Sequence, residues 1–142
     1  MADHVARARV EIDADAPAVW RALTDPGQLA RWMAGAQVSS TFRVGSPITW
    51  VGEMNGQPYE DKGEILAAEE PTRLSMTHYS PLMGAADAPE NYHTVTYQLS
   101  SHGDGTTVEL TQDGNDSAEQ ARQFSANWQG MLESLKSAVE SG

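Results

Sequence analysis

The stretch NWQGMLESLKSAVESG, residues 127–142, decides the fold of this chain. Apolar side chains recur in and just before it at spacings of three and four, and they are Phe124, Trp128, Met131, Leu132, Leu135 and Val139. This spacing predicts one apolar stripe on a helix from about Ser117 to Ser141, roughly 30 Å long at about 1.5 Å per residue. Because an isolated helix is marginal in water, we expect the stripe to cover the core of a domain.

Composition predicts a single domain, residues 1–142, and excludes several classes of function. The 9 Lys and Arg residues against 20 Asp and Glu residues give a net charge of −11, which argues against nucleic acid and anionic membranes as partners. The absence of cysteine excludes disulfides, thiolate metal sites and a cysteine nucleophile. The sequence has no apolar run of membrane-spanning length and no signal peptide core at its start, so we expect a cytoplasmic protein.

Local signals upstream of the long helix predict a strand, two short helices and then a series of strands. Residues 5–13 alternate apolar and polar side chains, as a strand does. Asp15 and Asp25 are each followed by proline within the first helical turn, which predicts two capped helices. Residues 37–112 read as about six strands, with a hairpin turn at Asn55 and Gly56. The order predicts an antiparallel sheet whose apolar face the last helix covers.

Four segments carry a resemblance to a known family. They are DAPAVWRALTDPGQLARWM (15–33), GEILAAEEPTRLSMTHYS (63–80), GDGTTVELTQDG (103–114) and the closing NWQGMLESLKSAVESG. In this order and spacing they resemble the START-like, helix-grip superfamily (SRPBCC, Bet v1-like), in the bacterial branch similar to the C-terminal domain of the heat-shock protein 90 ATPase activator. The resemblance covers about residues 10–142.

The resemblance implies an α+β helix-grip fold. Its curved antiparallel sheet of six or seven strands wraps around a long C-terminal helix, with two short helices after the first strand and a cavity between sheet and helix. The superfamily includes lipid and hormone binders, polyketide cyclases and many members of unknown activity, and shares no single catalytic motif. The fold therefore leaves the function open.

Strand alternation predicts which side chains face that cavity. The expected floor is Trp50, Met76, Val95 and Leu110 against Trp128, and the expected polar contacts are His78, His93, Tyr97 and Gln112. In the strand at residues 48–54, Val51 leaves the inward face ambiguous. The loop at residues 80–92 has no periodicity, and we expect it at the cavity mouth with Leu82 and Met83 at its tip.

The same polar residues have simpler interpretations. Each histidine can be a hydrogen-bonded structural residue, and Tyr97 can cap the core with its hydroxyl group. The carboxylates Asp61, Glu64, Glu69 and Glu70 are predicted to form a solvated acidic face. Two histidines without a placed carboxylate make a weak zinc site, so no metal and no cofactor is predicted.

Three functions remain open. The first is binding of a small apolar or aromatic molecule, lipid-like or polyketide-like, between sheet and helix. The second is an enzyme acting on such a ligand by cyclase-like or hydrolytic chemistry, with His78 or His93 as general base and Tyr97 as acid; no catalytic residue is assigned beyond these candidates. The third, least favoured, is a chaperone-activator-like interaction module. A homodimer is left open.

Overall fold

The computed structural model describes residues 4–33, 35–54, 56–81 and 86–141. The described residues form a seven-stranded antiparallel sheet, in the order β1-β7-β6-β5-β4-β3-β2, and three α-helices. The elements are β1 His4–Ile12, α1 Ala16–Thr24, α2 Pro26–Trp32, β2 Gln37–Ser39, β3 Pro47–Met54, β4 Gln57–Glu69, β5 Arg73–His78, the short 3-10 helix η2 Pro89–Asn91, β6 His93–His102, β7 Gly105–Asn115 and α3 Ala118–Ser141. The predicted α+β helix-grip architecture is confirmed.

The two short helices form where their caps predict them. The Asp15 carboxylate accepts a hydrogen bond of 3.0 Å from the Ala18 N–H, and the Asp25 carboxylate accepts one of 3.0 Å from the Gly27 N–H. Asp25 also ends α1, because its own N–H donates to the Arg21 carbonyl. One residue thus ends the first helix and starts the second, which holds α1 and α2 together as a tight pair.

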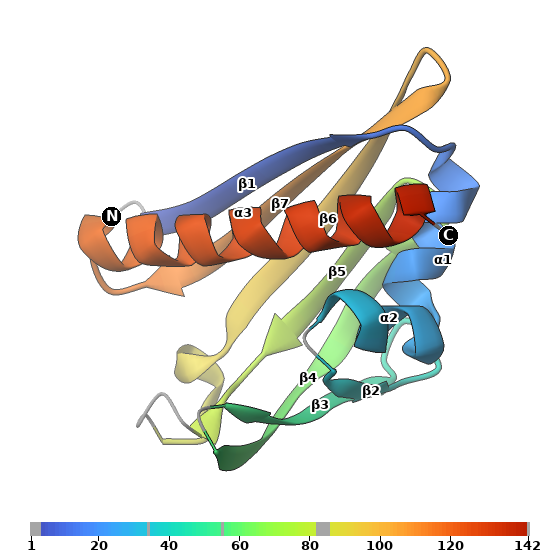
Figure 1. Cartoon of the computed structure of the whole chain (residues 1–142). Coiled ribbons are helices and arrows are strands. Elements are labelled where there is room, and N and C mark those ends of the chain that lie inside the picture. The colour runs from blue at the N-terminus through green and yellow to red at the C-terminus, as the bar shows by residue number, and fades with distance from the viewer. Residues whose placement is uncertain (1–3, 34, 55, 82–85, 142) are drawn as a thin grey trace.

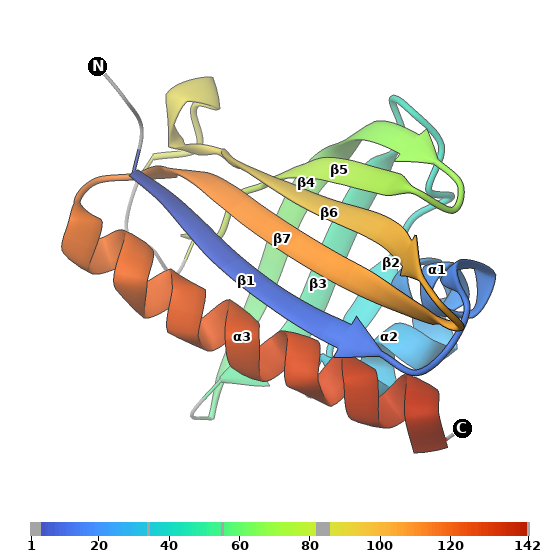
Figure 2. The same ribbon diagram turned by 90° about the horizontal axis from the view of Figure 1, so that it is seen from above.

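Helix α3 runs alongside β1 and crosses the whole molecule on the concave side of the curved sheet (Figures 1 and 2). Strand β1 lies at the edge of the sheet, and side chains of α3 form hydrogen bonds with the backbone groups on its open side. Ser125 and Gln129 accept from the Arg7 and Arg9 N–H groups, and Lys136 donates to the Glu11 carbonyl at 2.8 Å. Side chains of the helix therefore replace the missing neighbouring strand, which leaves less of the edge free for pairing with another chain.

The core is densely filled where α3 ends. Leu132 and Leu135 of α3 are fully buried, as are Val108 and Leu110 of β7. Helix α1 packs against α3, β6 and β7 at this end and contributes the buried Val19 and Leu23. The indole N–H of Trp32 donates to the Ala22 carbonyl at 2.9 Å, so the largest buried side chain of α2 has its polar atom satisfied.

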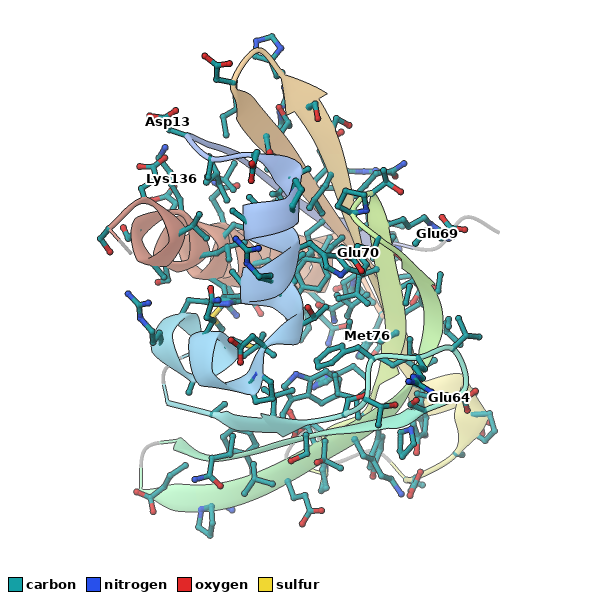
Figure 3. The ribbon with its side chains drawn as sticks, turned by 90° about the vertical axis from the view of Figure 1, so that its right-hand side faces the viewer. Asp13, Glu64, Glu69, Glu70, Met76 and Lys136 are labelled. Carbon is teal, nitrogen blue, oxygen red and sulfur yellow. The ribbon has the colours of Figure 1, made fainter. Side chains whose placement is uncertain are left out.

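The two faces of the sheet follow the predicted alternation. Figure 3 shows Met76 on the side that faces the helices, and Glu64 and Glu69 on the opposite side. In β3, Ile48 and Trp50 are buried whereas Val51 is exposed, which resolves the ambiguity of that strand. No helix in the described part of the chain is long and apolar enough to cross a membrane.

Candidate ligand cavity

A cavity of about 380 Å³ lies between the sheet and residues 124–131 of α3. Eight of the side chains predicted from strand alternation and the helix stripe line it, namely Trp50, Met76, His78, His93, Val95, Tyr97, Gln112 and Trp128. Leu110 has the predicted orientation but lies fully buried in the core instead of on the cavity wall. Leu82 and Met83, expected at the mouth, lie outside the described residues.

Eight further lining residues were not predicted, and they are Met33, Ala36, Tyr59, Asp61, Ser80, Phe124, Asn127 and Met131. The sequence carried a signal for several of them. Phe124 and Met131 belong to the same helix stripe as Trp128. Tyr59 and Asp61 are separated from the fully buried Ile65 by even numbers of positions along β4, so alternation places all three on one face.

Asp61 is not part of a solvated acidic face, and that prediction was wrong for this residue. Its side chain is only 14% exposed, whereas Glu64, Glu69 and Glu70 are exposed as expected. Asp61 Oδ2 lies 2.9 Å from His78 Nε2. A carboxylate accepts hydrogen bonds, so Nε2 of His78 carries the proton and Nδ1 is the acceptor of the neutral ring. Alternation required the carboxylate to face inward, and His78 on β5 satisfies one of its oxygens.

The Asp61–His78 pair is held against an aromatic wall. The ring centroids of Trp50 and His78 are 5.0 Å apart with an interplanar angle of 71°, an edge-to-face contact. The second carboxylate oxygen, Asp61 Oδ1, is buried without a hydrogen-bond partner among the described residues. The pair therefore contains one carboxylate oxygen that is buried and unsatisfied among the described residues.

His93 has a defined tautomer as well. Its Nδ1 donates to the Asp113 carbonyl at 2.7 Å, which leaves Nε2 as the acceptor of the neutral ring. Gly114 permits this approach, since its φ is +72° and a Cβ there would lie 3.2 Å from His93 Nδ1. The ring packs against Phe124 of α3, with the centroids 6.0 Å apart. His93 thus contributes a second imidazole acceptor to the same cavity.

Trp128 and Gln112 connect the helix to the sheet across the cavity. The Trp128 indole N–H donates to Gln112 Oε1, and the Trp128 ring meets the Tyr97 ring edge to face at 6.4 Å. Burial raises the pKa of Tyr97, so its hydroxyl group stays protonated at physiological pH. The Tyr97 hydroxyl group can therefore act as a neutral hydrogen-bond donor.

The end of the loop at the predicted mouth is attached to β4. Asp87 forms an ion pair with Lys62 and accepts a hydrogen bond of 2.6 Å from the Tyr92 hydroxyl group. The hydrogen bond from Lys62 lowers the pKa of Asp87. The Tyr92 ring stacks on Tyr79 with the centroids 5.2 Å apart. These contacts hold residues 86–92 next to Ser80 and His93, two residues of the cavity wall.

Within the described residues, no group of three or more histidine, aspartate or glutamate side chains is placed to hold a metal ion. The polar groups of the cavity are thus two imidazoles, a carboxylate, a carboxamide on the sheet and hydroxyl groups, together with Asn127 of α3. They can orient a ligand by hydrogen bonds in a mainly aromatic and methionine-lined space.

Comparisons with known proteins agree with this architecture. The family model described as activator of Hsp90 ATPase homolog 1-like protein matches residues 13–140. The solution structure of protein ChR145 from Cytophaga hutchinsonii is 42% identical, with a TM-score of 0.84, and the match covers 96% of this chain and 94% of that one. No significant match to the chain was found among curated proteins.

Two more distant structures show likeness in fold alone. CalU16 from Micromonospora echinospora is 24% identical with a TM-score of 0.72, over 97% of this chain and 85% of that one. DynU16, a protein in the dynemicin biosynthetic locus, is 23% identical with a TM-score of 0.80, over 99% of this chain and 49% of that one. This chain thus spans about half the length of DynU16.

Proposed function

The chain belongs to the activator of Hsp90 ATPase homolog 1-like family, and we propose that it binds a small, largely apolar or aromatic molecule in the cavity between the sheet and α3. The main support for this proposal is the presence of the cavity. Protein interiors are close-packed and rarely contain voids much larger than a water molecule. A space of about 380 Å³ is therefore unusual and suggests a binding site. Its size falls within the range of small-molecule sites, roughly 300–1,000 Å³.

The chemistry of the wall supports an apolar body with a few polar contacts. Trp50, Phe124 and Trp128 provide aromatic surface, and methionines such as Met76 and Met131 adapt to ligands of different shape. The polar groups come from several strands and from α3 and converge on one space, as is usual where they orient a ligand. Each methylene group that leaves water contributes about 0.8 kcal/mol, so affinity should rise about fourfold per methylene in a homologous series.

This series tests the proposal directly. Linear alcohols of increasing length are titrated into the protein by calorimetry, and the affinity should rise with each methylene until the cavity is full. Val95→Phe fills the space from β6 and should abolish the binding, whereas Gln98→Phe, on the exposed face of the same strand, should leave it unchanged. Equal binding to both variants would place the alcohols outside the cavity.

A second candidate function, an enzyme acting on the bound molecule, is supported by the Asp61–His78 pair. A carboxylate that orients an imidazole is a common arrangement for a general base, and here the distance is 2.9 Å. His93, with its own acceptor nitrogen, is the alternative base. Tyr97 suits hydrogen-bond donation better than proton transfer, because its raised pKa makes it a weak acid.

Single substitutions separate the two candidates. Native mass spectrometry of the protein purified from its own host identifies the molecule that occupies the cavity. His78→Ala and His93→Ala should weaken its binding modestly if the protein is a binder. In an enzyme, one of them should abolish conversion of a molecule that still binds. A protein that retains no molecule and binds no alcohol would make the interaction module the favoured hypothesis.

A further inference from the structure

Among the strongly acidic and strongly basic side chain types, the cavity wall contains only the acidic type. Among the described lining residues Asp61 is the one carboxylate, and none is lysine or arginine. The chain as a whole has a net charge of −11, so its long-range field also opposes an anion. A fatty acid entering the cavity would lose the hydration of its carboxylate without meeting a cationic side chain.

Asp61 has hydrogen-bonding capacity left over. His78 occupies Oδ2, while Oδ1 is buried and has no partner among the described residues. An ionised carboxylate offers about four acceptor positions, so the Asp61 side chain, which is 14% exposed and borders the cavity, can accept a further hydrogen bond from a ligand. An unpaired buried acceptor is unfavourable, which favours ligands that supply a donor.

The negative charge of Asp61 reaches the neighbouring wall of the cavity. The pKa of Tyr59 is raised, first by burial and then by the charge of Asp61. The Tyr59 ring lies across the backbone of Gly52, where a Cβ atom would come within 2.6 Å of the hydroxyl oxygen. Because Gly52 has no side chain, the Tyr59 ring has room beside the Asp61 carboxylate. Trp50 of β3 is the register partner of Asp61 on β4.

From these observations we infer that the cavity selects an apolar molecule ending in a protonated amine over an apolar carboxylate of the same length. The ammonium group would donate to Asp61, and the faces of Trp50 and Tyr59 would stabilise the cation through their ring quadrupoles. An alcohol of the same length would supply the hydrogen-bond donor without the charge, so its affinity should lie between those of the amine and the carboxylate. This inference rests on the proposed binding function and specifies the class of ligand.

Three ten-carbon probes that differ only in their end group test the inference: decylamine, decanol and decanoate. Calorimetric titration at pH 8 and physiological ionic strength should give the tightest binding for decylamine, weaker binding for decanol and the weakest for decanoate. We expect at least a tenfold ratio between amine and carboxylate. This ratio, measured in the unaltered protein, tests the inferred selectivity even if a variant folds poorly.

Asp61→Asn locates the selectivity. The amide keeps the shape and can still accept from His78, but it removes the negative charge, so the amine-to-carboxylate ratio should fall at least tenfold. Glu60→Gln is the matched control, because it removes one negative charge from an exposed neighbour on the same strand. The ratio should survive that change.

The outcomes distinguish this inference from the proposed function. Decanoate binding as tightly as decylamine, or a ratio that Asp61→Asn leaves unchanged, would overturn the inference while the binding function stands. If Asp61→Asn and Glu60→Gln lowered the amine-to-carboxylate ratio equally, the ratio would arise from the general negative charge of the protein. That result would also overturn the inference. Failure of all three probes to bind would remove the binding function together with the inference.

Discussion

The two halves of α3 face different interiors. In the second half, Leu132 and Leu135 are fully buried against the sheet and against α1. In the first half, Phe124 and Trp128 belong to the same apolar stripe but remain half-buried and line the cavity. The helix stripe is therefore continuous, whereas the packing beneath it is not.

The difference arises from what fills the space between helix and sheet. At the packed end, α1 contributes Val19 and Leu23 to the layer beneath α3. At the hollow end, Met33, the residue that follows α2, lines the cavity wall. The short helices after the first strand thus decide how much of the interior becomes core and how much stays available to a ligand.

The largest expected effect comes from removing the helix that spans both ends. A chain truncated after Ala126 loses Leu132 and Leu135 and uncovers most of the hydrogen-bonded edge of β1. We expect no cooperative unfolding transition by circular dichroism in urea. A soluble truncated chain that melts cooperatively would show that the sheet does not need its cover.

Large-to-small substitutions on α3 compare the two ends directly. Leu132→Ala at the packed end should lower the free energy of unfolding by about 2–5 kcal/mol, because it opens a new void. Met131→Ala, one position earlier but on the cavity wall, should lower it by only about 1 kcal/mol. Urea unfolding measures both, and equal losses would contradict the distinction between a packed end and a hollow end.

Small-to-large substitutions reverse the test. Val108→Phe at the packed end should destabilise the protein by about 1–3 kcal/mol through overpacking. Val95→Phe projects into the cavity, so the free energy of unfolding should stay within about 1 kcal/mol of the unaltered protein. A loss at Val95 as large as that at Val108 would mean that the cavity cannot accept a side chain.

The smallest expected effect is a pH dependence at the cavity wall. The pKa of Tyr97 is raised in the folded protein, whereas an unfolded tyrosine titrates near about 10. Above that pH the unfolded chain loses a proton that the folded chain keeps, so stability falls as pH rises, by at most about 1.4 kcal/mol per pH unit. Below that pH the stability does not depend on this residue's ionisation.

Tyr97→Phe isolates this contribution, since Tyr59 and Tyr92 also have raised pKa values and remain in both proteins. Urea midpoints measured at pH 7 and pH 11 should fall less in Tyr97→Phe than in the unaltered protein. Identical falls in the two proteins would show that the Tyr97 hydroxyl group is accessible to solvent in the folded state.

The fold could be predicted because its signals are local. Asp15 and Asp25 cap helices through contacts with residues two or three positions away, and strand alternation assigns Met76 and Val95 to the inner face. The role of Ser125 and Gln129 could not be predicted. They lie off the apolar stripe and look solvent-facing until the fold brings the edge of β1 beside them.

The candidate site was predicted in part, for a physical reason that Leu110 and Asp61 illustrate. Alternation tells which face a residue occupies but not how far the helix stands from the sheet at that point, so Leu110 was placed at the cavity although it lies in the packed core. Asp61 was assigned to solvent because of its charge, and only the tertiary contact with His78 shows why an inward-facing carboxylate is tolerated.

The four tryptophans allow the most direct test, because Trp50 and Trp128 line the cavity whereas Trp20 and Trp32 are buried outside it. Nuclear magnetic resonance spectra record the indole N–H signal of each tryptophan while decanol is added. The account predicts saturable shifts of the Trp50 and Trp128 signals, with those of Trp20 and Trp32 nearly unchanged. No saturable shift, or equal shifts of all four signals, would contradict a ligand cavity at the hollow end of the helix.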